Sequence, residues 1–227
     1  MRILLSLGVL SVMIAAAHAG TLVGKLDLPQ TPASPQVTKG FLDRSENPFA
    51  PVRSIDIARQ VVVVVEGEEK PVSPPQVMWD LVGESFAKPV IAAPAGADVV
   101  IRNTSKVPRT LVVKENAKLL DPGPLNPTAT KSFKATDVGK SFTVGDKDAP
   151  HVVGHVVIVN TQFIAYPDES GHFQIDNIPP GAYKVKIWYR DNWLQRPDDD
   201  VNVSAKGKTE LNPKIAAAAF ASPAPAK

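Results

Sequence analysis

The sequence predicts an all-β protein made of two merged β-sandwich units. Three observations lead to this fold class. Residues 150–189 read as successive strands and turns, and the 22 prolines are spread along the chain, where they disfavour helices. No helical periodicity extends beyond two turns, except in the alanine-rich end of the chain.

Residues 1–19 predict a secretory signal peptide. Arg2 supplies a positive start, an apolar run extends from Ile3 to Ala17, and Ala17-His18-Ala19 forms an A-x-A cleavage site before Gly20. We therefore expect export to the periplasm or secretion, with no membrane insertion after signal cleavage.

The composition excludes several classes of function. The chain contains no cysteine, so it has no disulfide, no thiolate nucleophile and no soft metal ligand. Its 25 basic and 23 acidic residues are interspersed, and this pattern argues against nucleic acid and against a polybasic membrane patch.

The first part of the exported chain, residues 20–150, reads as one sandwich behind a proline-rich linker. A short strand, TLVGKLDL, precedes the linker. The five valines 61–65 are stiff at χ1 and do not alternate with polar residues, which predicts a strand covered on both faces. Further strands follow, separated by Gly83, Pro89 and the Pro94-Ala95-Gly96 turn, and a hairpin is expected around Gly139.

Residues 151–212 predict a second, smaller sandwich. An apolar strand runs up to Asn160, and FIAYPDESGHFQI reads as a hairpin in which Asp168 favours a side-chain turn and Gly171 a positive φ. After the Pro179-Pro180-Gly181 turn, AYKVKIWY alternates like a strand with one core face and one wet face. A last strand, VNVS, follows, and the Ala/Pro-rich tail 213–227 is expected to be disordered.

Two motifs in these units resemble known families. The D-x-x-G-x-F…P-P-G-x-Y frame, from Asp168 to Tyr183, resembles the carboxypeptidase regulatory-like (transthyretin-like) β-sandwich. Upstream, PVIAAPAGADVVIRNTS resembles the strand, P-x-G turn and strand-ending Asn of cupredoxins, which have a Greek-key β-sandwich. The order of the two is similar to exported bacterial proteins called methylamine utilisation proteins. This resemblance implies a scaffold and says little about function.

The copper ligands that the cupredoxin resemblance implies are not kept. The position six residues after Asn103 is Arg109 where copper-binding members have His, and the Cys, His and Met positions fall on Asp146, Ala149 and Val152. A blue-copper site needs a cysteine thiolate and two imidazoles. We therefore expect no copper cofactor, and we expect these four residues to converge at one end of the sandwich.

Other metal sites are weakly indicated. His151 and His155 are four residues apart on an expected strand, about 13 Å, so their rings are too far apart to share an ion. Asp146, Asp148 and His151 are candidate ligands for a hard ion, and Asp198-Asp199-Asp200 for calcium. In both cases the alternative is a solvated loop.

The densest aromatic cluster is Trp188, Tyr189 and Trp193. Because Trp188 and Tyr189 alternate along a strand, we expect one of them to leave aromatic surface exposed. Such a surface suits a sugar or a protein partner, whereas the alternative is core packing. No serine is tied by the sequence to a histidine and an acid, so no catalytic residue is assigned.

These observations predict an exported, non-enzymatic binding or structural module whose partner is an envelope protein or a glycan. Two alternatives stay open: a cupredoxin-type metal-binding or electron-transfer protein with a non-standard site, and a glycan-binding module that uses Trp193.

Overall fold

The computed structural model describes residues 19–29, 56–68 and 73–220 and has an all-β architecture, which confirms the predicted fold class. The predicted signal peptide and most of the predicted linker lie outside these residues. In chain order the strands are β1 (Gly20–Lys25), β2 (Val61–Glu66), β3 (Val77–Val82), β4 (Ser85–Phe86), β5 (Val90–Pro94), β6 (Asp98–Asn103), β7 (Leu111–Val113), β8 (Thr130–Lys134), β9 (Ser141–Asp146), β10 (Val153–Val159), β11 (Ile164–Ala165), β12 (His172–Ile178), β13 (Gly181–Tyr189), β14 (Asn192–Trp193), β15 (Asp199–Val203) and β16 (Lys208–Leu211).

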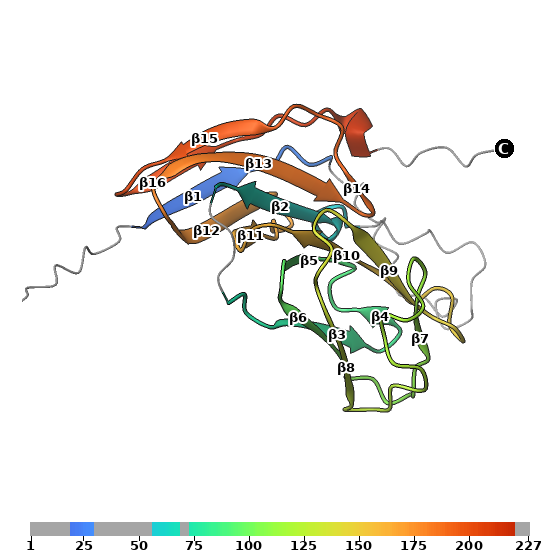
Figure 1. Cartoon of the computed structure of the whole chain (residues 1–227). Coiled ribbons are helices and arrows are strands. Elements are labelled where there is room, and N and C mark those ends of the chain that lie inside the picture. The colour runs from blue at the N-terminus through green and yellow to red at the C-terminus, as the bar shows by residue number, and fades with distance from the viewer. Residues whose placement is uncertain (1–18, 30–55, 69–72, 221–227) are drawn as a thin grey trace, which may run out of the picture.

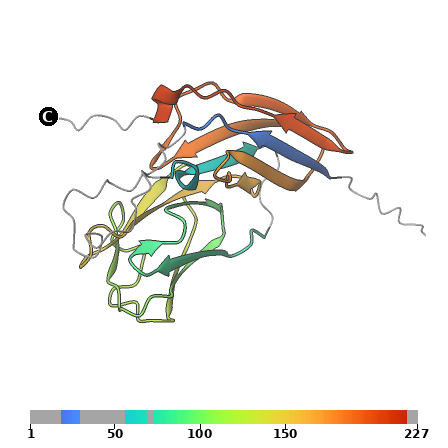
Figure 2. The same ribbon diagram turned by 180° about the vertical axis from the view of Figure 1, so that it is seen from behind.

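The strands form four sheets that stack in layers (Figure 1). Two sheets, with strand orders β4-β3-β6-β8 and β5-β10-β9-β7, enclose one core and form what we call the lower sandwich. The other two, β12-β1-β16 and β11-β2-β13-β14 with β15 also paired to β13, enclose a second core and form the upper sandwich. The same stacking is visible from behind (Figure 2).

A third apolar layer joins the two sandwiches. Val62, Val64 and Trp188 of the upper sandwich pack with Val90 and Val157 of the lower one, and all five side chains are buried. Hydrogen bonds reinforce this contact: Arg59 Nη2 donates to the carbonyl of Ala87 at 2.6 Å, and the backbone N–H of Ala92 donates to the Tyr166 hydroxyl at 3.2 Å. We call this layer the middle core.

The valine run of β2 has the two-faced burial that its sequence predicts. Val61, Val63 and Val65 face the upper core, whereas Val62 and Val64 face the middle core, and all five are 0% exposed. Because successive side chains of a strand point to opposite faces, an unbroken apolar run is required wherever both faces are covered.

Strand pairing crosses the predicted boundary between residues 150 and 151. β10, which the prediction assigns to the second unit, lies between β5 and β9 of the lower sandwich. Conversely, β1 pairs with β12 and β16, and β2 pairs with β13, so both belong to the upper sandwich. The lower sandwich is therefore inserted between two strands of the upper one.

The segment predicted as a hairpin, 163–175, is instead a corner between sheets. β11 pairs with β2, whereas β12 pairs with β1 in the facing sheet. The predicted turn chemistry is present. Asp168 Oδ1 accepts the backbone N–H groups of Ser170 and His172, each at 2.9 Å, and Gly171 has a φ of +84°. The turn prediction is confirmed, but the two strands that flank the turn do not pair with each other, because their partners β1 and β2 lie in different sheets.

The first part of the predicted disordered tail is folded onto the upper sandwich. Ile215 and Phe220 are buried in the upper core, and the Phe220 ring lies edge-on to Tyr189 with 5.1 Å between centroids. These apolar side chains cover the end of β13, which composition alone does not reveal. Residues 221–227 lie outside the described part of the chain.

Candidate functional site

The four positions aligned with copper ligands lie together, as expected, at one end of the lower sandwich. Arg109 Nη1 forms an ion pair with Asp146 Oδ2 at 3.3 Å. The Asp146 backbone N–H donates to the carbonyl of Val152, and the Val152 N–H donates to the carbonyl of Ala149. The Arg109 and Asp146 side chains are 9% and 1% exposed, so this pair is buried.

Further hydrogen bonds hold the pair in place. Arg109 Nη2 donates to the carbonyl of Gly83 at 2.9 Å, and Asp146 Oδ1 accepts the backbone N–H of Asp148 at 3.0 Å. The neighbouring Asn103 side chain is also buried and donates to the carbonyls of Val107 and Leu125. A guanidinium with a hydrogen-bonded carboxylate is a poor match for blue copper, because it provides neither thiolate nor imidazole and already holds a positive charge.

The candidate hard-ion ligands do not form a site. Asp146 is committed to Arg109, and His151 Nε2 lies 3.7 Å from Glu84 Oε2 on the surface. Asp199 pairs with Arg196 at 2.7 Å within β15 and the turn before it. Among the described residues, no three His, Cys, Asp or Glu side chains are grouped so that they could hold a metal ion.

The predicted aromatic surface is mostly interior. Trp188 is buried in the middle core and Tyr189 in the upper core, because both faces of β13 are covered at this end. The expectation that one of the two is exposed is therefore wrong. Trp193 remains half-buried, with its ring edge-on to Trp188 at 5.0 Å between centroids.

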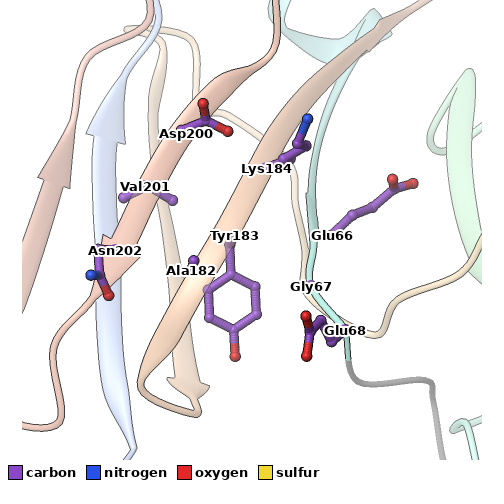
Figure 3. Close-up of a pocket in the computed structure, with 9 residues that line it drawn as sticks. All are labelled: Glu66, Gly67, Glu68, Ala182, Tyr183, Lys184, Asp200, Val201 and Asn202. Carbon is purple, nitrogen blue, oxygen red and sulfur yellow. The ribbon is translucent and has the colours of Figure 1, made fainter.

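A cleft of about 500 Å³ opens at the other end of β13, where β2, β13 and β15 lie side by side (Figure 3). Ala182, Tyr183 and Val201 contribute apolar surface, and Gly67 lies so close to the Tyr183 ring that a Cβ atom there would meet it. The polar side chains that line the cleft are Glu66, Glu68, Lys184, Asp200 and Asn202.

A smaller hollow of about 310 Å³ lies farther along β13, beside Lys186, Trp193 and Arg196. Lys186 Nζ lies 2.7 Å from Glu66 Oε2, which lines the larger cleft, and 6.0 Å from the centroid of the Trp193 ring. The Glu66–Lys186 ion pair therefore stands between the two hollows. No sequence pattern indicates this arrangement, because it depends on the pairing of β13 with β2.

A cluster of polar side chains lies where the lower sandwich approaches the turn between β13 and β14. Thr143 donates its backbone N–H and its hydroxyl to the Glu115 carboxylate, and its hydroxyl is 3.4 Å from His155 Nδ1. Burial lowers the pKa of His155, partly offset by Asp191 and Glu115. Burial alone would raise the pKa of Glu115, but the hydrogen bonds from Thr143 outweigh it and lower that pKa.

No helix in the described residues is long and apolar enough to span a membrane.

The family model for domain II of polysaccharide lyase family 4 matches residues 128–211. This is less than half of the chain, and it begins just before β8 of the lower sandwich and ends with β16 of the upper one. No curated protein matches the sequence.

Similar solved structures are cupredoxins that align with only part of the chain. Amicyanin from Paracoccus versutus is 14% identical, with 42% of this chain and 96% of that chain covered and a TM-score of 0.33. The Cu(I) form of an amicyanin mutant is 15% identical over 42% of this chain and 97% of that chain, again with a TM-score of 0.33. A purple cupredoxin from Nitrosopumilus maritimus is 15% identical over 37% of this chain and 99% of that chain, with the same TM-score.

Proposed function

We propose that this protein is an exported, non-enzymatic binding module of the periplasm or cell envelope that works without copper. The observation that carries the proposal is the buried Arg109–Asp146 ion pair at the positions aligned with copper ligands. None of the comparisons gives positive evidence of catalysis. The two sandwiches are joined through the middle core. A joined scaffold with a cleft that combines apolar surface and polar side chains suits binding better than electron transfer.

The experiment that tests the metal-free function is metal analysis of protein purified from its native compartment, followed by titration with Cu(I) and Cu(II). We expect substoichiometric copper and no intense visible absorption. Amicyanin processed in parallel serves as the positive control. Stoichiometric copper in the native protein would overturn the proposal and restore the electron-transfer alternative.

Glycan binding is a second candidate, and the match to domain II of a polysaccharide lyase favours it. Trp193 is the one residue of the predicted aromatic surface that keeps partial exposure in the structure. We expect Trp193→Ala to weaken retention of the protein on envelope polysaccharide in affinity electrophoresis, and Trp193→Phe to preserve much of it. Equal retention of wild type and Trp193→Ala would remove Trp193 from the binding surface.

The proposed location has its own test. Mass spectrometry of the protein from a periplasmic or secreted fraction should give an N-terminus at Gly20, the residue after the predicted A-x-A site. Recovery of the uncleaved chain from the cytoplasm would contradict the proposal.

A further inference from the structure

One face of β13 changes from buried to open along its length. Trp188, Lys186, Lys184 and Ala182 point to the same face because side chains alternate along a strand. Trp188 is covered by the lower sandwich, whereas Lys184 and Ala182 are exposed. In Figure 1 the upper sandwich accordingly extends past the lower one at the end of β15. We call this exposed part of the face the open strip.

The open strip carries both hydrogen-bond donors and hydrogen-bond acceptors. Lys184 lies opposite Glu66 on β2 and opposite Asp200 on β15, and Ala182 lies opposite Asn202. Glu66 is held by Lys186, whereas Lys184 forms no ion pair with any described residue. Carboxylates accept hydrogen bonds from hydroxyl groups, ammonium groups donate hydrogen bonds to them, and amides do both.

An aromatic ring marks the other end of the strip. Trp193 pairs with Trp188, six residues along β13 from Ala182. At about 3.3 Å per residue, the strip from Trp193 to Asn202 is about 20 Å long. This length and the 500 Å³ cleft at its far end suit an extended ligand of several rings.

We propose that the open strip binds a linear oligosaccharide made of neutral sugars or amino sugars. This inference rests on the binding function proposed above and names the ligand class and its place. An aromatic ring at one end, with carboxylates and an amide along the rest, matches the apolar faces and hydroxyl edges of sugars.

Charge sets the preference among sugars. The carboxylates of Glu66, Glu68, Asp198 and Asp200 border the strip, and the cations that line it are Lys184, Lys186 and Arg196. Lys186 is already paired with Glu66 and Arg196 with Asp199, so carboxylates outnumber cations there. A chain of uronic acids would bring further negative charge to these carboxylates, whereas an amino sugar would bring a compensating positive charge.

An extended peptide fits the strip less well. A peptide that binds by strand addition needs a sheet edge with free backbone groups. Around Lys184, however, β13 is paired on both sides, with β2 and with β15. A ligand on the face of this sheet therefore meets side chains, and these are polar groups suited to hydroxyls.

The test is calorimetric titration of the full exported chain with three tetramers: cellotetraose, a glucosamine tetramer and tetragalacturonate. We expect binding of the first two and at least tenfold weaker binding of the third. Asp200→Asn should weaken binding by about tenfold, the loss of one charged hydrogen bond. Ala182→Phe should abolish binding by filling the cleft. Asp121→Asn, an equally exposed substitution on the lower sandwich, should change nothing.

Matching thermal unfolding midpoints will show that the variants fold. The inference is overturned if neither the neutral nor the amino-sugar tetramer binds, or if Ala182→Phe binds normally. If binding is lost in Trp193→Ala but kept in Asp200→Asn and Ala182→Phe, the protein binds a glycan but the open strip is not the site. If no sugar binds, the oligosaccharide inference is wrong, and the copper titration still tests the metal-free function separately.

Discussion

At the scale of single residues, a buried ion pair and its hydrogen bonds fix one end of the lower sandwich. Arg109 and Asp146 form the ion pair, and the carbonyl of Gly83 and the backbone N–H of Asp148 complete its hydrogen bonding. One atom, Arg109 Nε, is buried without a partner among the described residues. A buried pair with one unsatisfied donor is weak evidence for net stabilisation of the fold.

Removing one partner of this ion pair should cost more than removing both. In Arg109→Met, the buried carboxylate of Asp146 loses its counter-charge, and we expect a loss of about 3–5 kcal/mol in the free energy of unfolding. The double variant Arg109→Met/Asp146→Leu should be less destabilised than this single variant. Urea denaturation of wild type, both single variants and the double variant measures the coupling. A double variant at least as unstable as Arg109→Met would contradict the argument.

The partly buried His155 should make stability depend on pH. Burial lowers the pKa of His155 in the folded state, so the unfolded chain binds the proton more readily. Stability is then undiminished above the ordinary histidine pKa of about 6.5 and falls as the pH drops below it. Thermal unfolding from about pH 8 to pH 5 should show a shallower decline for His155→Gln than for wild type. The exposed His151→Gln serves as the control, and identical pH profiles for His155→Gln and wild type would refute the prediction.

At the scale of elements, β10 was predicted to belong to the second unit but lies in the lower sandwich and packs against its core. Gly154 of β10 lies against the stacked rings of Trp79 and Phe86, whose centroids are 4.2 Å apart, and a Cβ atom at Gly154 would lie 2.4 Å from Trp79. This glycine is therefore needed for the close approach of β10 to β3 and β4.

Gly154→Ala should destabilise the protein by about 1–3 kcal/mol, because it overpacks a buried site. Gly145 on the adjacent strand β9 is the matched control. A Cβ atom there meets only the carbonyl oxygen of Val152, at 3.7 Å, so Gly145→Ala should be tolerated. Chemical denaturation of both variants is the measurement, and equal midpoints would show that the aromatic stack adjusts without cost.

Elements whose signals are local could be predicted from sequence, and those set by distant partners could not. The valine run of β2 and the Asp168–Gly171 turn carry their own stereochemical signals, and both were predicted correctly. The placement of β1 and β2 with β12 and β13 depends on partners more than a hundred residues away, and the burial of Trp188 and Tyr189 follows from that placement. The convergence of Arg109 and Asp146 was predictable only through the aligned motif, and the cleft beside Lys184 not at all.

At the scale of the whole molecule, the middle core joins the two sandwiches, and we expect them to unfold as one cooperative unit. Trp188 supplies the largest side chain in this layer, and its indole Nε1 donates to the carbonyl of Arg190 at 2.9 Å. Separating the two sheets that border this layer would expose β2 and β10 to water, and the side chains of both strands there are fully buried.

Calorimetry should show a single unfolding transition whose calorimetric and van't Hoff enthalpies agree. Trp188→Ala should cost about 3–5 kcal/mol through the cavity it leaves and should separate the transition into two. Trp193→Ala, at the rim of the same layer, serves as the milder control. Two transitions in the wild-type protein would show that the sandwiches unfold independently.

The insertion of one sandwich into the other also limits the order in which the parts of the chain can fold. β1 emerges early, but its neighbour β16 is the last strand of the described chain, and Lys25 bonds to Asn212 across a separation of 187 residues. Closing a loop of this length is entropically costly, and contacts this distant slow folding. The lower sandwich can close once β10 has emerged, while the five valines of β2 wait for β13. An apolar strand left uncovered for that interval is prone to aggregate, so this topology makes β2 the segment most exposed to wrong pairing until β13 is present.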